Sequence, residues 1–174
     1  MARHRLLVAA GAWTVLAAFA TGAAAATQVW SGRTFLFSKT AFTDYTLAAN
    51  QDRILPTVWI TRANVQGIFN ANTETAYVGG VSPEDTEWAT GDAVDYGSLV
   101  FLPWENWANR NPPSTVGVNA VVHLIHEDIY IDIVFTSWAQ GSASGGAFAY
   151  RRAVDPGVTP AQGTTWGRIK VLFR

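Results

Sequence analysis

One segment of this chain, residues 129–138, sorts its side chains into two sets with a period of two residues. The odd-numbered set, which is uniformly apolar, is Ile129, Ile131, Ile133 and Phe135. The even-numbered set, which is mixed, is Tyr130, Asp132, Val134 and Thr136. This period is that of a β-strand with one face toward a core. We therefore predict that the odd-numbered side chains are buried and that the others face solvent or a cleft.

A second run of β-branched and apolar residues, 118–125, precedes this segment across a short polar stretch at 126–128. Two such runs predict an antiparallel hairpin. Shorter strand-forming runs lie at 34–38, 58–61, 67–70, 75–78, 98–102 and 148–152. Strands divided by turn-rich segments favour an all-β fold over a parallel α/β sheet. We predict an antiparallel β-sandwich that resembles a jelly roll.

Two long segments between these runs carry turn-forming residues instead of a strand pattern. Residues 81–97 are acidic, and residues 103–116 contain two tryptophans and a pair of prolines. Segments of this length in a compact domain are often functional. We expect both to be irregular loops.

The first 26 residues have the three parts of a secretory signal peptide. Arg3 and Arg5 form a basic start, an apolar run follows to about residue 20, and small residues occupy 22–26. The apolar run is shorter than the ~20 residues that a membrane-spanning helix needs, which argues against a signal anchor. We predict a signal peptide at 1–26, a β-sandwich domain at 27–153, a linker at 154–163 and a C-terminal tail at 164–174. The expected location is secreted, periplasmic or cell-surface, with no membrane span after cleavage.

The tail shows a helical pattern in place of strand alternation. Trp166, Ile169 and Phe173 would lie along one face of a short helix, and basic residues follow at its end. We expect a short helical or irregular tail that packs against the domain or docks a surface partner.

Composition narrows the classes of function further. The chain has no cysteine, which excludes disulfides, thiolate metal sites and lipidation at a cysteine. Without Arg3 and Arg5, the 12 basic residues become 10 against 13 acidic ones, a net charge of about −3. No basic patch is present, so we do not expect nucleic acid as a partner.

Aromatic residues suggest a binding surface. Seven of the eight tryptophans follow the signal peptide, and indole rings can stack on sugar rings as well as fill a core. Three tryptophans lie in the turn-rich segments, with amide and charged residues close by in sequence. The predicted glycan-binding residues are Trp88, Trp104, Trp107, Asn106, Asn109 and Arg110. Burial in the core or anchoring of a loop is the alternative role for the tryptophans.

The acidic segment is the best place for a metal ion. Calcium takes 6–8 oxygen ligands at about 2.3–2.6 Å, and calcium is the one cofactor that the sequence suggests. The candidate ligands are Glu84, Asp85, Glu87, Asp92 and Asp95. Their spacing matches no known calcium motif, and a solvated acidic loop is the alternative.

The sequence shows no recognisable catalytic set. It contains no G-x-S-x-G, and His123 and His126 are three apart on a predicted strand, so they would face opposite sides. The alternative to a non-catalytic protein is a carbohydrate hydrolase or lyase that pairs Asp132 with Glu127 or Asp128, because two carboxylates can flank a glycosidic bond.

Six short stretches of the sequence are distinctive. They are ANQDRI at 49–54, VWITR at 58–62, GIFN at 67–70, SPEDTEWA at 82–89, DIYIDIVFTSW at 128–138 and GGAFAYR at 145–151. Together they resemble a largely uncharacterised group of exported bacterial proteins, in which such a domain often precedes a C-terminal sorting or anchoring segment. The resemblance covers about residues 28–152 and implies an exported β-rich domain. Residues 166–174 stand where such proteins carry an apolar anchor.

We therefore expect an exported, non-catalytic protein that binds a glycan or another component of the cell envelope or extracellular space. An enzyme that uses acidic residues is one alternative. A structural component of a surface or matrix is the other, and an unpaired apolar edge strand would favour it.

Overall fold

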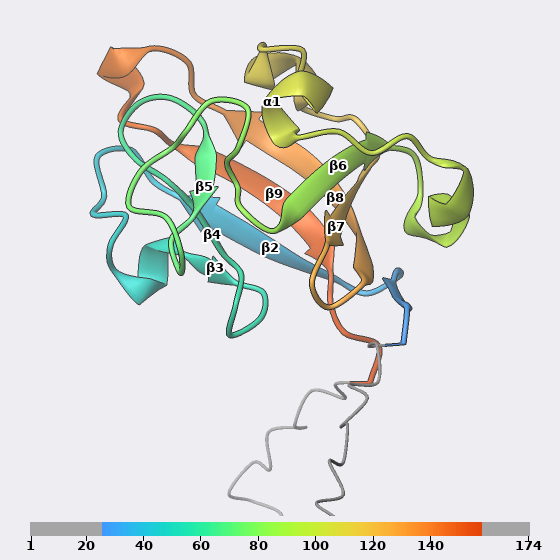
Figure 1. Cartoon of the computed structure of the whole chain (residues 1–174). Helices are drawn as coiled ribbons and strands as arrows, with labels where there is room; N and C mark the ends of the chain where they lie inside the picture. The colour runs from blue at the N-terminus through green and yellow to red at the C-terminus, as the bar shows by residue number, and fades with distance from the viewer. Residues whose placement is uncertain (1–25, 158–174) are drawn as a thin grey trace, which may run out of the picture.

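A computed structural model describes residues 26–157 and is mostly β, with antiparallel sheets and only short helices (Figure 1). The larger sheet has the strand order β2-β9-β8-β7-β6, and β1 pairs with β8. Its strands are β1 (Gln28–Trp30), β2 (Thr34–Lys39), β6 (Thr86–Thr90), β7 (Ala120–Leu124), β8 (Ile129–Trp138) and β9 (Phe148–Ala153). The smaller sheet, with the order β3-β4-β5, consists of β3 (Asp52–Arg53), β4 (Trp59–Arg62) and β5 (Ile68–Asn70).

The helical elements are short. Among the residues that the structure describes, the one α-helix is a single turn, α1 (Trp104–Trp107), and the rest are 3₁₀ turns. These are η1 (Ala48–Asn50), η2 (Ala93–Ser98), η3 (Pro112–Thr115) and η4 (Ser142–Ser144). Within residues 26–157, no helix has the length and apolar character that crossing a membrane requires. The predicted signal peptide, the tail at 164–174 and most of the linker lie outside the described residues.

The predicted hairpin is confirmed. Strand β7 pairs antiparallel with the first half of β8, with Leu124 opposite Ile129. The turn places Asp128 at a positive φ of 54°, which Asp tolerates better than most residues. The second half of β8 pairs with β9, while the short parallel strand β1 lies beside its first half. Strand β8 is therefore the central strand of the larger sheet.

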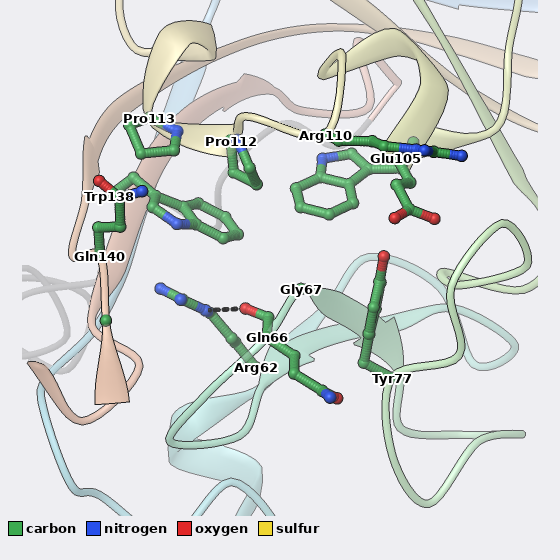
Figure 2. Close-up of a pocket in the computed structure, with 12 residues that line it drawn as sticks. Arg62, Gln66, Gly67, Tyr77, Glu105, Arg110, Pro112, Pro113, Trp138 and Gln140 are labelled. Carbon is green, nitrogen blue, oxygen red and sulfur yellow. Dashed lines mark hydrogen bonds between the residues drawn. The ribbon is translucent and has the colours of Figure 1, made fainter. Parts of the chain in front are cut away.

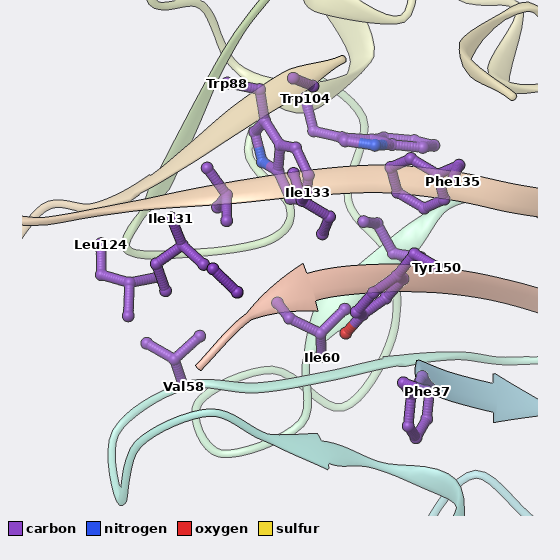
Figure 3. Packing of buried hydrophobic residues seen from close by; sticks show 14 of the residues in the cluster. Phe37, Val58, Ile60, Trp88, Trp104, Leu124, Ile131, Ile133, Phe135 and Tyr150 are labelled. Carbon is purple, nitrogen blue, oxygen red and sulfur yellow. The ribbon is translucent and has the colours of Figure 1, made fainter. Parts of the chain in front are cut away.

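The two sheets share one core. The four apolar side chains that the alternation assigns to the core, Ile129, Ile131, Ile133 and Phe135, are all buried. Val58, Ile60 and Ile68 from the smaller sheet belong to the same buried cluster. Figure 3 shows Val58 and Ile60 close to Ile131 and Tyr150 from the larger sheet. Apolar side chains from both sheets thus form a single interior.

Some predicted elements are wrong. Residues 75–78 form turns, and of residues 98–102 only Leu102 makes an isolated bridge, to Trp88. Strand β6 lies inside the segment that we expected to be irregular. Its sequence, TEWAT, places Trp88 and Ala89 in buried positions, so a short strand is present among turn-forming residues.

Candidate functional site

The described domain contains a pocket where the end of β8 meets the smaller sheet and the segment that holds α1 and η3 (Figure 2). Its cavity has a volume of about 280 Å³. Aromatic, charged and amide side chains line it: Tyr77, Trp104, Trp138, Arg62, Glu105, Arg110, Gln66 and Gln140. Pro112, Pro113, Gly67 and Gly141 complete the wall. A small set of polar groups between aromatic faces is typical of ligand pockets.

The aromatic side chains hold one another in place. Trp138 stacks on Trp104 with ring centroids 5.4 Å apart, and Trp104 meets Tyr77 edge-on at 6.2 Å. In Figure 2, Trp138 and Tyr77 stand on opposite sides of the hollow. Both are half-buried, whereas Trp104 is buried behind them. Trp138 and Tyr77 are therefore the two rings that a ligand can reach.

A β-bulge directs Trp138 into this pocket. The pairing of β8 with β9 shifts between Phe135 and Ser137, so Thr136 is the extra residue. Beyond the bulge, Trp138 lies opposite Phe148, which is buried. Without the shift, Trp138 would share the outer face of the sheet with Thr136 and the other even-numbered residues.

Gly67 makes room for the pocket wall. A Cβ atom at this position would lie 2.4 Å from Cε2 of Tyr77 and 2.7 Å from Trp104. Such distances are far below van der Waals contact, so any other residue would displace these rings. The glycine before β5 therefore sets how closely Tyr77 approaches the backbone.

Arg62 lies at the inner side of the pocket, at the end of β4. Its guanidinium stacks on Trp138, 4.0 Å from the ring centroid, and the residue is only 3% exposed. Nε donates to the carbonyl oxygen of Gln66 at 2.7 Å (the dashed line in Figure 2). Nη1 donates to the carbonyl oxygens of Ala139 at 2.9 Å and Ala147 at 3.2 Å. Burial lowers the pKa of Arg62 to about 10, because a low-dielectric surrounding disfavours the charged form.

Glu105 and Tyr77 form the other side of the pocket. Burial and the neighbouring Glu105 carboxylate raise the pKa of Tyr77 to about 12. Tyr77 is therefore neutral at physiological pH and presents its ring beside that carboxylate. Arg110 is exposed and lines the outer part of the pocket.

The predicted glycan-binding set is only partly brought together. Trp88 and Trp104 are buried, at 0% and 1% exposure, so the prediction that they form an exposed stacking surface is wrong. Trp107 stacks on Trp88 at 5.7 Å and donates from Nε1 to Thr90 at 3.0 Å, as expected for a loop anchor. Arg110 and the buried Trp104 line the pocket, whereas Asn106 and Asn109 are exposed and do not.

Other residues of the pocket were not predicted from the sequence. They are Arg62, Tyr77 and Trp138, each from a different segment of the chain. Trp138 and Arg62 lie in strings with a strand pattern, which indicates packing and gives no sign of a binding site. A tryptophan that ends an alternating strand just before a glycine-rich segment is the one local signal that could have marked this place.

The predicted calcium site is not assembled. Within the described residues, no group of three or more His, Asp or Glu side chains lies close enough together to hold a metal ion. The candidate ligands are spread along β6 and beyond both of its ends. Asp85 accepts a hydrogen bond from the backbone of His126, and Glu87 interacts with His123. The strand separates carboxylates that looked clustered in the sequence.

The carboxylates of the alternative enzyme make separate contacts. Asp128 lies in the turn before β8 and contacts His123, whereas Asp132 lies on β8 itself. Asp132 accepts a hydrogen bond from the backbone of Ala93 at 2.6 Å. Glu127 accepts one from Thr57 at 2.6 Å. Each carboxylate thus has its own separate partner.

The outer face of the larger sheet carries an ordered polar cluster. The His123 ring lies between Glu87, at 2.8 Å from Nδ1, and Asp128, at 3.2 Å from Nε2. It stacks in parallel on Tyr130 with centroids 4.0 Å apart. Cross-strand pairing explains this arrangement, because Glu87, His123 and Tyr130 occupy facing positions on β6, β7 and β8.

Comparison of the chain with known protein families, with curated proteins and with solved structures found no match.

Proposed function

We propose that this chain is an exported, non-catalytic protein that binds a glycan of the cell envelope or extracellular space in the pocket beside Trp138. The observation that carries the proposal is the arrangement of Trp138 and Tyr77, whose accessible rings stand on opposite sides of a hollow with polar side chains around it. Sugar rings present apolar faces and hydroxyl edges, which aromatic faces and amide or charged groups respectively complement.

Export is part of the same proposal. The signal-peptide pattern of residues 1–26 supports it. Mass spectrometry of the exported product tests it, with an expected N-terminus at residue 26 or 27. A product that retains Met1 would contradict it.

We also propose that the two sheets form a small β-sandwich. Their shared apolar core supports this description. The jelly-roll connectivity stays a prediction.

A matched pair of variants tests glycan binding. Trp138 and Trp59 are both half-buried, and each has an arginine 4.0 Å above its ring, but Trp59 lies outside the pocket. We expect Trp138→Ala to abolish binding to a polysaccharide panel and Trp59→Ala to leave it unchanged, as measured by isothermal titration with the exported chain. Loss of binding in the Trp59 variant alone, or no binding by the unmutated protein, would contradict the proposal.

Assembly of a surface layer or matrix is the second candidate function. Strand β2 is an edge strand of the larger sheet, and its Phe35 and Leu36 are 44% and 48% exposed. An exposed apolar edge is a template for pairing with another chain. Light scattering over a range of concentrations tests this role: self-association that Leu36→Lys removes would favour it, and a monomer at all concentrations would exclude it.

A further inference from the structure

We propose that the pocket selects an acidic sugar, one that carries a carboxylate or a sulfate group, and that Arg62 binds this anionic group. The inference rests on the proposed glycan-binding function and adds the chemical class of the ligand. Three observations carry it: the unused donors of Arg62, the missing counter-ion and the charges around the pocket.

The hydrogen-bond donors of Arg62 are only partly used. A guanidinium has five N–H groups. One on Nε and two on Nη1 donate to the carbonyl oxygens of Gln66, Ala139 and Ala147. The two N–H groups on Nη2 have no hydrogen-bond partner among residues 26–157. Nη2 is not among the fully buried atoms that lack a partner, which are Trp104 Nε1 and Glu127 Oε2. The three carbonyls fix the guanidinium while leaving this nitrogen for a ligand.

The charge of Arg62 also lacks a partner. Arg152, the other buried arginine that bridges the two sheets, is held by both oxygens of Asp52, at 2.6 Å and 2.8 Å. Arg62 has three neutral carbonyls and the ring face of Trp138, and no carboxylate pairs with it in the described part of the chain. A buried charge without a counter-ion is costly. An anion that enters the pocket would supply that counter-ion.

The surrounding charges favour an anion as well. Lys39 is 1% exposed and close enough to Arg62 that the two charges repel: burial first, and then Arg62, lower the pKa of Lys39. Arg110 adds a positive charge on the outer part of the pocket. Glu105 is the one carboxylate in the lining, against the two arginines Arg62 and Arg110. The balance of charge in the lining is therefore positive.

The competing explanation is that Arg62 only ties the β4–β5 hairpin to the loop between β8 and β9. Three carbonyl contacts would suffice for that role. It predicts no preference between charged and neutral sugars, so the comparison can be made on the unmutated protein.

Binding of galacturonate oligomers to the exported chain, measured by isothermal titration, tests the inference. The control ligands are the methyl esters of the same oligomers, which keep the rings and lose the charge. A set of sulfated galactose oligomers then separates the two sources of the anion. We expect the acid or the sulfated oligomers to bind at least about tenfold more tightly than the uncharged ones, since hydrogen bonds to charged groups are about twice as strong as neutral ones. High salt should reduce this preference.

Two variants assign the preference to Arg62. Arg62→Gln should reduce the affinity for the anionic oligomer to that of the neutral one, and Arg53→Gln, which alters the arginine stacked on Trp59, should not. If Arg62→Gln fails to fold, the comparison of acid with ester in the unmutated protein decides alone.

The outcomes distinguish failure of the acidic-sugar inference from failure of the proposed glycan binding. Equal affinity for charged and neutral oligomers, or binding of neutral glycans only, would overturn the inference and leave the proposed function standing. No binding of any glycan would overturn both. A preference for the anionic oligomer that a folded Arg62→Gln variant retains would also overturn the inference.

Discussion

Removing the carboxylate of Asp52 should destabilise this domain more than most single substitutions. Asp52 on β3 accepts two hydrogen bonds from Arg152 on β9, and it accepts a third from the Tyr150 hydroxyl at 2.7 Å. All three residues are buried. Burial alone would lower the pKa of Arg152, but Asp52 raises it above its usual value. The group is therefore a direct, buried polar link between the two sheets.

The magnitude follows from what Asp52→Ala leaves behind. Breaking a buried ion pair by removing one partner costs about 3–5 kcal/mol, because the remaining charge is uncompensated. The Tyr150 hydroxyl also loses its acceptor, which costs about 1–3 kcal/mol, although the two losses share one carboxylate and do not simply add. We expect a loss of about 5 kcal/mol, comparable with the whole stability of a small domain at about 5–15 kcal/mol. For a domain of this size the melting temperature would fall by roughly 15 °C.

Thermal and urea unfolding of a double-mutant cycle measures this effect. The cycle consists of Asp52→Ala, Arg152→Met and the double variant. We expect the double variant to be more stable than Asp52→Ala alone, because no uncompensated guanidinium remains. The coupling energy should be at least about 2 kcal/mol. Additive losses within about 0.5 kcal/mol would refute the reasoning, since they would show that Asp52 and Arg152 do not stabilise each other.

Three further predictions concern the pocket, the outer face and metal. Gly67→Ala should displace Tyr77 and cost about 1–3 kcal/mol in urea unfolding; an unchanged midpoint would contradict the close contact. Burial, and after it Asp92, raises the pKa of Asp132, so the ionised form is disfavoured in the folded state. Asp132→Asn should therefore raise the melting temperature by about 1 °C at pH 7, a gain limited by solvent screening. The difference from the unmutated protein should vanish as the pH falls and the carboxyl is protonated. A difference that persists at pH 3 would contradict this cause. EGTA should leave the melting temperature unchanged, and a fall would point to a calcium site that the described residues do not form.

The alternation of residues 129–138 predicted the centre of the fold correctly. Burial of Ile129, Ile131, Ile133 and Phe135 and the hairpin with residues 118–125 are both confirmed. Burial favours apolar side chains, so a core strand can be recognised in the sequence by its apolar residues. Strand β6 shows no such apolar pattern, because only Trp88 and Ala89 at its centre are apolar and turn-forming residues surround it. Its place is determined by pairing with β7, which local sequence does not show.

The pocket was hidden for a related reason. A strict period of two would place Trp138 on the outer face, together with Thr136, and the bulge at Thr136 reverses this orientation. Trp138 then reaches Arg62 and Trp104, which lie on segments far away in the sequence. Alternation in the sequence therefore identifies β8 as a core strand. It places Trp138, the residue of β8 that lines the pocket, on the wrong face. Bulges commonly redirect side chains beside binding sites, so a tryptophan after a break in pairing is better evidence for this pocket than the clustered Trp104 and Trp107.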